Sequence, residues 1–306
     1  TLKVTQRTLD SYHKHIQDFE SWARQHNHRV NLDSLDRLVV RYMTQLALEE
    51  EVQPSASAYL VFGLQLLRCN KPKVEFLPLS KEALAGWRKL APGGMRLPVP
   101  EEFIFDFAHL ALDDGHVDIA FGMILQYDTY LRPSECLGLE QQHLGFPAGG
   151  RYNKWSIVVA PFQLGATTKT GKFDDSVLVA DKSDRAWLTQ AMDLYVKQHP
   201  GKLFPKLTLA KYEAWFRNAA GKLKYKSKCV MPHILRHSGA SNDAYHKRRS
   251  LLDIQKRGRW EAKKSVSRYE KHALLLKRWE QAAADRLPAI RRRSQALPGR
   301  LLQALR

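Results

Sequence analysis

The sequence predicts a mainly α-helical protein with a small antiparallel β-sheet, an α+β fold built from two domains. Apolar residues recur at helical spacing along most of the 306 residues. A single pair of β-branched runs predicts the sheet, and a proline- and glycine-rich break divides the chain. At roughly 100–200 residues per domain, this length also suggests two domains.

The first part of the chain is predicted to form a small helical bundle. Ile16, Phe19 and Trp22 lie at helical spacing, and the same pattern recurs over residues 35–46, 55–67 and 80–90. The segment 91–100 then contains three prolines and two glycines, which is typical of a linker. We therefore place the first domain at about 1–92 and the second at about 98–285.

The second domain is predicted to combine helices with one hairpin. Residues 155–160 are predicted to form a strand, and residues 176–179 its returning partner, with Lys169 and Lys172 near the turn between them. The predicted helices cover residues 101–112, 117–130, 134–139, 183–198, 208–222, 233–247, 250–257 and 271–285. The last segment, 286–306, is a basic tail whose Leu297, Leu301, Leu302 and Leu305 need a partner surface, for which a neighbouring protomer is a candidate.

Composition excludes several classes of protein. No stretch approaches the ~20 apolar residues of a membrane span, and the first residues have no apolar signal core. The three cysteines are far apart, which argues against a disulfide framework or a zinc ribbon. These features favour a reducing, intracellular compartment and no membrane partner.

The positive charge is concentrated at one end of the chain. The formal net charge is +18, and residues 222–306 hold 23 Lys and Arg against 6 Asp and Glu, whereas residues 1–221 hold 26 against 25. Such a polarity is typical of a surface that binds a polyanion, most commonly nucleic acid. A generally basic, solvated surface is the alternative.

Four separated segments carry residues suited to phosphodiester chemistry without a metal. They are Tyr130–Leu139 with Arg132 and Glu135, Thr168–Lys172 with Lys169, Pro232–Ala240 with His233, Arg236 and His237, and Gly258–Glu270. In the last segment Trp260 precedes Tyr269 by nine residues. Two arginines can hold the non-bridging oxygens, an indole or imidazole N–H can add a donor, and a tyrosine can attack.

This set, in this order, resembles the tyrosine recombinase (phage integrase) family over about residues 100–280. The resemblance rests on Arg132 and Glu135 in a Leu-Arg-x-x-Glu stretch, on Lys169 at a hairpin turn, and on His233 and Arg236 as His-x-x-Arg. Trp260 stands at a position where most members have histidine, and Tyr269 matches the nucleophile. Taken singly these motifs are weak, since an isolated tyrosine or tryptophan is more often a core residue.

The resemblance implies a fold, an activity and roles for these residues. It implies a helical core-binding-like domain over 1–92 and an integrase-like catalytic domain over 98–285. The implied activity is site-specific cleavage and rejoining of double-stranded DNA through a 3′-phosphotyrosyl intermediate, by a homo-tetramer on DNA, wherever the cell keeps its DNA. It would need no cofactor. The implied catalytic residues are Tyr269, Arg132, Lys169, His233, Arg236 and Trp260.

Other residues receive supporting roles. His233 is expected to take the tyrosine proton, with Glu135 and His237 orienting their neighbours. Lys169 is preferred over Lys172 as the general acid. Lys172, Arg259 and Arg268 are expected DNA contacts. His233 and His237 have a spacing that can hold a metal, but Ile234 stands where a metalloprotease needs glutamate, so no metal site is expected.

Two other functions use the same residues or the same fold. A type IB topoisomerase-like enzyme or a hairpin telomere resolvase shares this chemistry. A DNA-binding protein that kept the fold without catalysis is the second alternative, and the complete residue set argues against it. The N-terminal domain is only mildly basic, with 14 Lys and Arg against 10 Asp and Glu over residues 1–100.

Overall fold

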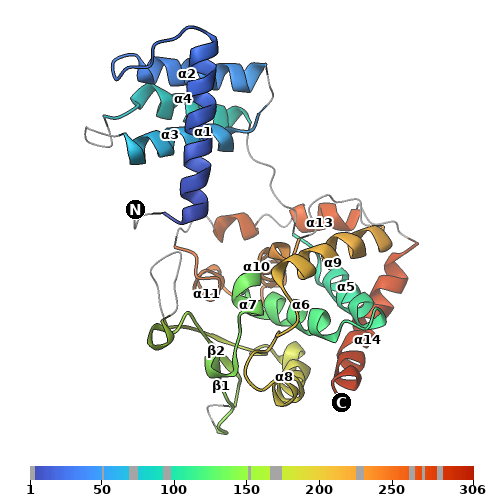
Figure 1. Cartoon of the computed structure of the whole chain (residues 1–306). Coiled ribbons are helices and arrows are strands. Elements are labelled where there is room, and N and C mark those ends of the chain that lie inside the picture. The colour runs from blue at the N-terminus through green and yellow to red at the C-terminus, as the bar shows by residue number, and fades with distance from the viewer. Residues whose placement is uncertain are drawn as a thin grey trace. The chain divides into compact units, whose positions relative to one another are not determined.

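The computed structural model divides the chain into two compact units, Thr1–Met95 and Arg96–Arg306. The structure describes residues 4–49, 52–68, 75–91, 98–150, 153–165, 174–224, 231–261, 266–270, 273–280 and 285–306 (Figure 1). The division between the units falls inside the proline- and glycine-rich segment 91–100. The mainly helical fold with a small antiparallel sheet, predicted from the sequence, is confirmed.

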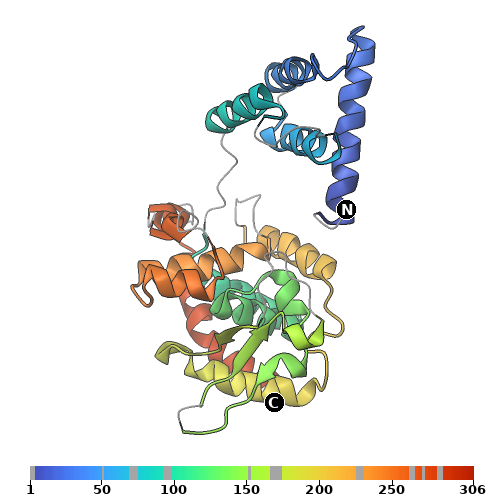
Figure 2. The same cartoon turned by 90° about the vertical axis from the view of Figure 1, so that its left-hand side faces the viewer.

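The N-terminal unit consists of helices packed around one apolar core (Figure 2). Its helices are α1 (Gln6–Gln25), α2 (Leu35–Leu48), α3 (Pro54–Leu67) and α4 (Pro78–Leu90). Phe19 and Trp22 of α1 are buried, and the indole N–H of Trp22 donates to the side chain of Gln45 at 2.6 Å. The Asp36 carboxylate accepts hydrogen bonds from the first backbone N–H groups of α4, which a helix leaves without internal partners.

The second unit is built mostly of helices. Their order is α5 (Glu101–Asp113), α6 (Val117–Thr129), α7 (Pro133–Leu137), α8 (Ala186–Gln198), α9 (Leu209–Lys222), α10 (His233–Tyr245), α11 (Leu251–Arg257), α13 (Ala273–Glu280) and α14 (Leu287–Ala304). Short 3-10 turns lie at η1 (Gln141–His143), η2 (Phe162–Leu164), η3 (Ser183–Arg185) and η4 (Ser267–Glu270).

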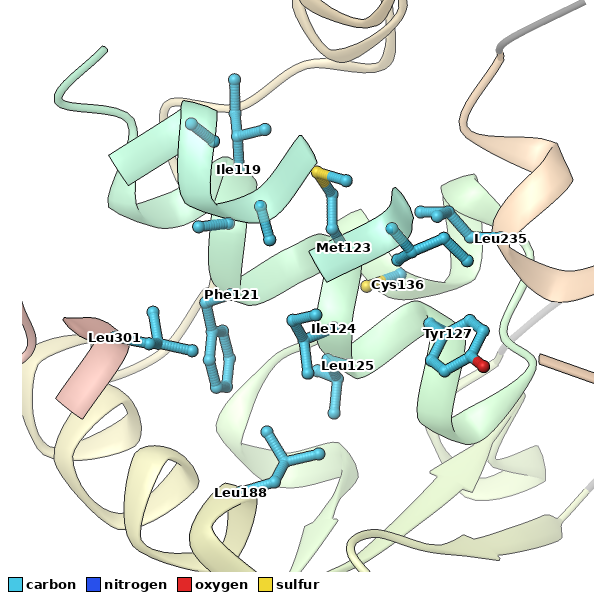
Figure 3. Packing of buried hydrophobic residues seen from close by; sticks show 14 of the residues in the cluster. Ile119, Phe121, Met123, Ile124, Leu125, Tyr127, Cys136, Leu188, Leu235 and Leu301 are labelled. Carbon is cyan, nitrogen blue, oxygen red and sulfur yellow. The ribbon is translucent and has the colours of Figure 1, made fainter. Parts of the chain in front are cut away.

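Helix α6 forms the centre of this unit. Every residue from Ile119 to Thr129 is buried, as expected from a sequence that is apolar on most sides. Phe121, Met123 and Leu125 pack among side chains from other elements, including Leu188 of α8 and Leu301 of α14 (Figure 3). Because α6 ends next to Arg132, this packing fixes one end of the candidate site.

The sheet has three antiparallel strands in the order β1-β2-β3. They are β1 (Leu144–Gly145), β2 (Ser156–Val159) and β3 (Asp175–Leu178). The predicted hairpin corresponds to β2 and β3, paired with Ile157 opposite Val177. Strand β1 was not predicted, because two residues are too few to show an alternating pattern. Lys169 and Lys172 lie outside the described residues.

The C-terminal segment packs within its own chain, which corrects the expectation that its leucines need a neighbouring protomer. It forms α14, which lies against α5 and buries Ile290, Leu297, Leu301 and Leu305 in the core of the second unit. The buried Asp106 of α5 also pairs with Arg293. The apolar face therefore finds its partner in the same chain. Among the helices in the described ranges, none is long and apolar enough to cross a membrane.

Candidate active site

Arg132 is placed by a sharp change of chain direction between α6 and α7. Tyr130 ends α6 in the left-handed region with φ 56°, and Arg132 then adopts an extended conformation as the N-cap of α7. Pro133 suits the first turn of that helix. The Glu135 carboxylate accepts from the Arg132 backbone N–H at 2.7 Å and from its Nη1 at 2.5 Å. The guanidinium is thereby held, while the Arg132 side chain as a whole remains one-third exposed, at 33%.

Arg236 lies on α10 and is almost completely buried, with 2% of its surface exposed. Its guanidinium donates to the backbone carbonyl oxygens of Tyr130, at 2.5 Å, and of Gly258. It also lies over the Trp260 ring, 4.8 Å from the centroid. A larger residue would not fit at position 258 with the Trp260 ring where it is, because a Cβ there would come within 1.8 Å of that ring. Backbone groups from two distant segments therefore fix this arginine.

Three arginines share one carboxylate at the centre of the site. Arg259 pairs with Glu135 at 2.5 Å, and Arg236 lies 3.9 Å from the same side chain. Burial lowers the pKa of Arg236 to about 9, and the charges of Arg259 and Arg132 contribute in the same direction. Burial raises the pKa of Glu135, but Arg259 and Arg132 outweigh it, so the pKa is lowered overall. The cluster has more positive than negative charge, which an anionic ligand would balance.

Tyr269 is buried beside these arginines. It is 3% exposed, and its hydroxyl oxygen lies 2.7 Å from Nδ1 of His237 in a hydrogen bond. The Trp260 ring is 4.9 Å from the Tyr269 ring, and the same indole contacts Arg236. The structure thus brings Arg236 from one segment of the sequence together with Trp260 and Tyr269 from another, and the three form one connected group.

The histidines differ from the roles that we expected. We assigned the tyrosine proton to His233 and an orienting role to His237, but the His237 imidazole bonds to the Tyr269 hydroxyl. The His233 ring lies 5.1 Å from the His237 ring. Both histidines are on α10, one turn apart, so either ring can face the same space. The geometry gives His237 the more direct position.

The structure describes only some of the other residues that were expected in the site. Lys169 and Lys172 lie outside the described residues, as does the side chain of Arg268. Arg259 was expected to contact DNA; in the structure its side chain is 7% exposed and its guanidinium pairs with Glu135. It belongs to the central arginine group. No group of three or more His, Cys, Asp or Glu side chains suited to a metal ion occurs among the residues that the structure describes.

A buried ionic network that we did not predict supports the site. Asp243 on α10 is fully buried and accepts from Lys182 Nζ at 2.9 Å and from Arg249 Nε at 2.9 Å. Arg257 of α11 donates to the backbone oxygens of Asp128 and Leu178, both at 2.8 Å, and so ties the segment before Gly258 to α6 and β3. Asp128 could have indicated this network from the sequence, since a carboxylate inside an apolar helix needs a cation.

The network predicts a loss of stability in acid. Burial raises the pKa of Asp243, but Lys182, the Tyr130 hydroxyl and Arg249 outweigh it and the net pKa is lowered. A carboxyl whose folded pKa is depressed stabilises the fold fully above its unfolded pKa, about 3.9, and this contribution is lost progressively as the pH falls from that value through the lower pKa of the folded state. Asp243→Asn should therefore lower the free energy of unfolding at pH 7 by about 1.5–3 kcal/mol, because Lys182 and Arg249 each lose one charged partner while keeping another, Asp128 and Asp181 respectively.

This expectation is measured by urea unfolding, followed by tryptophan fluorescence, at pH 7, 5 and 3.5. The difference between the wild type and Asp243→Asn should be the same at pH 7 and 5 and should begin to shrink at pH 3.5, because the unfolded carboxyl then takes up a proton while the folded one, with its lowered pKa, stays ionised longer. A difference that is constant across the three pH values would contradict the role of the ionised carboxylate.

Comparison with solved structures identifies the fold. The chain is similar to the Tn1549 transposon integrase in complex with transposon right end DNA, with a TM-score of 0.61 and 15% identity, over 94% of this chain and 93% of that chain. It is also similar to the XerH site-specific recombinase bound to palindromic difH substrate in a post-cleavage complex, with a TM-score of 0.56 and 13% identity, over 90% of this chain and 75% of that chain. No protein-family model and no curated protein sequence matches the chain.

The chain thus shares the fold of a transposon integrase and of a site-specific recombinase, which agrees with the fold that the sequence resemblance implied. A second complex of the Tn1549 integrase, with circular intermediate DNA, gives a TM-score of 0.60 at 16% identity, over 94% of this chain and 93% of that chain. The likeness extends over both units of the chain. At such identities it is a likeness of fold, and the chemistry is argued from the site.

Proposed function

We propose that this protein is a site-specific DNA recombinase that cleaves and rejoins DNA through a covalent tyrosine intermediate. One observation carries the proposal: the Tyr269 hydroxyl, the Trp260 indole and the Arg236 guanidinium form one connected group. Arg132 joins it through Glu135. A nucleophile beside an excess of fixed cations is suited to attack on a phosphodiester.

The first chemical step exchanges one phosphoester bond for another. The Tyr269 phenolic oxygen attacks the scissile phosphorus, and its proton passes to an imidazole, for which His237 is best placed by its 2.7 Å hydrogen bond. The bond from phosphorus to the 5′ oxygen breaks, leaving a 3′-phosphotyrosine and a 5′ hydroxyl. Attack by a 5′ hydroxyl of a partner strand reverses the step. The number of phosphoester bonds is unchanged, so no energy source is required.

The remaining residues act on charge and on the leaving group. Arg132 and Arg236 donate to the non-bridging oxygens, which gain negative charge in the transition state. The Trp260 N–H can add one donor but cannot transfer a proton, so it positions the phosphate. Lys169 protonates the departing 5′ oxygen in the scheme that the family resemblance implies. The homo-tetramer on DNA belongs to the same proposal.

Covalent trapping tests the proposed function. Purified protein is mixed with a library of randomised nicked duplexes in EDTA, so that the cleaved fragment diffuses away and rejoining is prevented. We expect a protein band shifted by the attached DNA on a denaturing gel, and sequencing of that DNA gives the target site. If neither the library nor fragments of the DNA that flanks the gene of this protein give an adduct, a DNA-binding protein without catalysis would be favoured. Supercoil relaxation without strand exchange would favour a topoisomerase.

DNA binding should depend steeply on salt. The chain has a formal net charge of +18, and a protein that neutralises DNA phosphates releases counterions as it binds. For about six to ten phosphate contacts, we expect the affinity to fall by about 10³- to 10⁵-fold between about 50 and 200 mM salt. Fluorescence anisotropy with a labelled duplex measures this. An affinity that changes less than about threefold over that range would remove the argument from charge.

A further inference from the structure

Tyr130 occupies a backbone conformation that a tyrosine rarely adopts. Its φ is 56° and its ψ is 30°, in the left-handed region that favours glycine. The position is sensitive, because Arg132 follows two residues later and the Tyr130 carbonyl oxygen accepts from the buried Arg236. Strained residues persist where the surroundings over-determine them, and they cluster at functional sites. The side chain of Tyr130 must therefore supply what holds this conformation.

The ring of Tyr130 is enclosed by residues of the candidate active site. It is fully buried and belongs to a small apolar cluster that also contains Tyr269. The Arg257 guanidinium lies 5.5 Å from its centroid, and the Trp260 ring lies 6.3 Å away. Gly239 on α10 makes room for it, since a Cβ there would come within 2.8 Å of the Tyr130 ring. The ring thus fills the space between α10 and the Gly258–Trp260 segment.

The hydroxyl of Tyr130 ends on a fixed acceptor. It donates to Oδ2 of Asp243 at 2.5 Å. Asp243 is itself held by Lys182 and Arg249, each at 2.9 Å. A hydrogen bond to an ionised, buried carboxylate is stronger and shorter than one between neutral groups. The ionic network therefore fixes the hydroxyl of Tyr130, and the fixed side chain in turn restricts the Tyr130 backbone.

We propose that Tyr130 is a positioning residue that sets the geometry of the two phosphate-binding arginines. Its carbonyl oxygen orients Arg236, its backbone turn places Arg132, and its anchored side chain keeps both fixed. Asp243 acts through it. The inference rests on the proposed function for its catalytic consequence, while the placement of the arginines around an anion is a separate property that can be measured by itself.

The test compares Tyr130→Phe with the wild type by two measurements. The variant keeps the ring and removes the hydroxyl that reaches Asp243. Single-turnover cleavage of the nicked duplex should be about tenfold slower in the variant than in the wild type. The affinity of the variant for DNA should stay within about twofold, because only contacts to the transition state change. Isothermal titration of the protein with vanadate, in the absence of DNA, should give an affinity about tenfold weaker. Arg236→Lys serves as the reference for a disrupted arginine pair.

Tyr195→Phe is the matched control. Tyr195 is also fully buried, and its hydroxyl lies within hydrogen-bond distance of the Leu203 carbonyl, at 2.9 Å, and of Asp118, at 3.1 Å, both outside the arginine group. This variant should leave cleavage and vanadate affinity within about twofold of the wild type. Equal effects of the two variants, or a Tyr130→Phe protein with unchanged vanadate affinity, would overturn the inference. If the wild type forms no adduct but Tyr130→Phe still weakens vanadate binding, the proposed function fails and the positioning role stands.

Discussion

Tyr269→Phe is expected to abolish covalent attachment to DNA while leaving DNA binding within about twofold of the wild type. The variant removes the only atom of this residue that can attack phosphorus, and it keeps the ring that packs against Trp260. The lost hydrogen bond to His237 should cost only about 1 kcal/mol of stability. A nicked substrate and a denaturing gel measure the adduct, and anisotropy measures binding.

The matched control is Tyr212→Phe. Tyr212 is equally buried, and its hydroxyl lies 3.3 Å from the Gln126 side chain, in the core of the second unit. This variant should form the adduct at nearly the wild-type rate. A Tyr269→Phe protein that still attached to DNA would mean that another residue is the nucleophile.

Arg236→Lys is expected to slow cleavage by about 10²- to 10³-fold, the usual effect of removing one fixed donor to a transition-state oxygen. Lysine keeps the charge but has no planar fork, so it cannot hold the Tyr130 and Gly258 carbonyls and a phosphate together. The measurement is single-turnover cleavage at saturating protein. The loss should appear in the cleavage rate and leave the affinity for DNA within about threefold.

Arg185→Lys separates this effect from simple loss of folding. Arg185 is 3% exposed and pairs with Glu101, away from the arginine group around Glu135. We expect the two variants to lose similar stability in urea, with only Arg236→Lys losing most of its cleavage rate. Comparable rates for both variants would contradict the assignment of Arg236 to the phosphate.

The fold could be predicted because helical spacing is a local signal, and the candidate site residues could be proposed because each lies in a short motif. Helical spacing predicted the helices, and α6 is the clearest case, since a run that is apolar on most sides has to be buried. Arg132, Arg236, Trp260 and Tyr269 were found by their order and spacing. The contacts between these segments could not be predicted, because a contact such as that of Arg236 with the Tyr130 carbonyl joins residues that lie far apart in the chain.

The supporting network shows this limit most clearly. Nothing in the sequence around Tyr130 indicates a positive φ, and its hydrogen-bond partner Asp243 is 113 residues away. The basic C-terminal region was interpreted as a surface for a polyanion. Within it, Arg249, Arg257 and Arg293 are paired with acidic side chains of the same chain. Part of that charge therefore balances buried carboxylates, which a count of residues cannot reveal.

The most direct measurement of the central claim is to locate the covalent bond. The trapped adduct is digested with nuclease and protease, and the modified peptide is sequenced by mass spectrometry. We predict a nucleotide joined through its 3′ phosphate to Tyr269, with a free 5′ hydroxyl on the released strand. A bond to any other residue, or a link through a 5′ phosphate, would contradict the proposed mechanism.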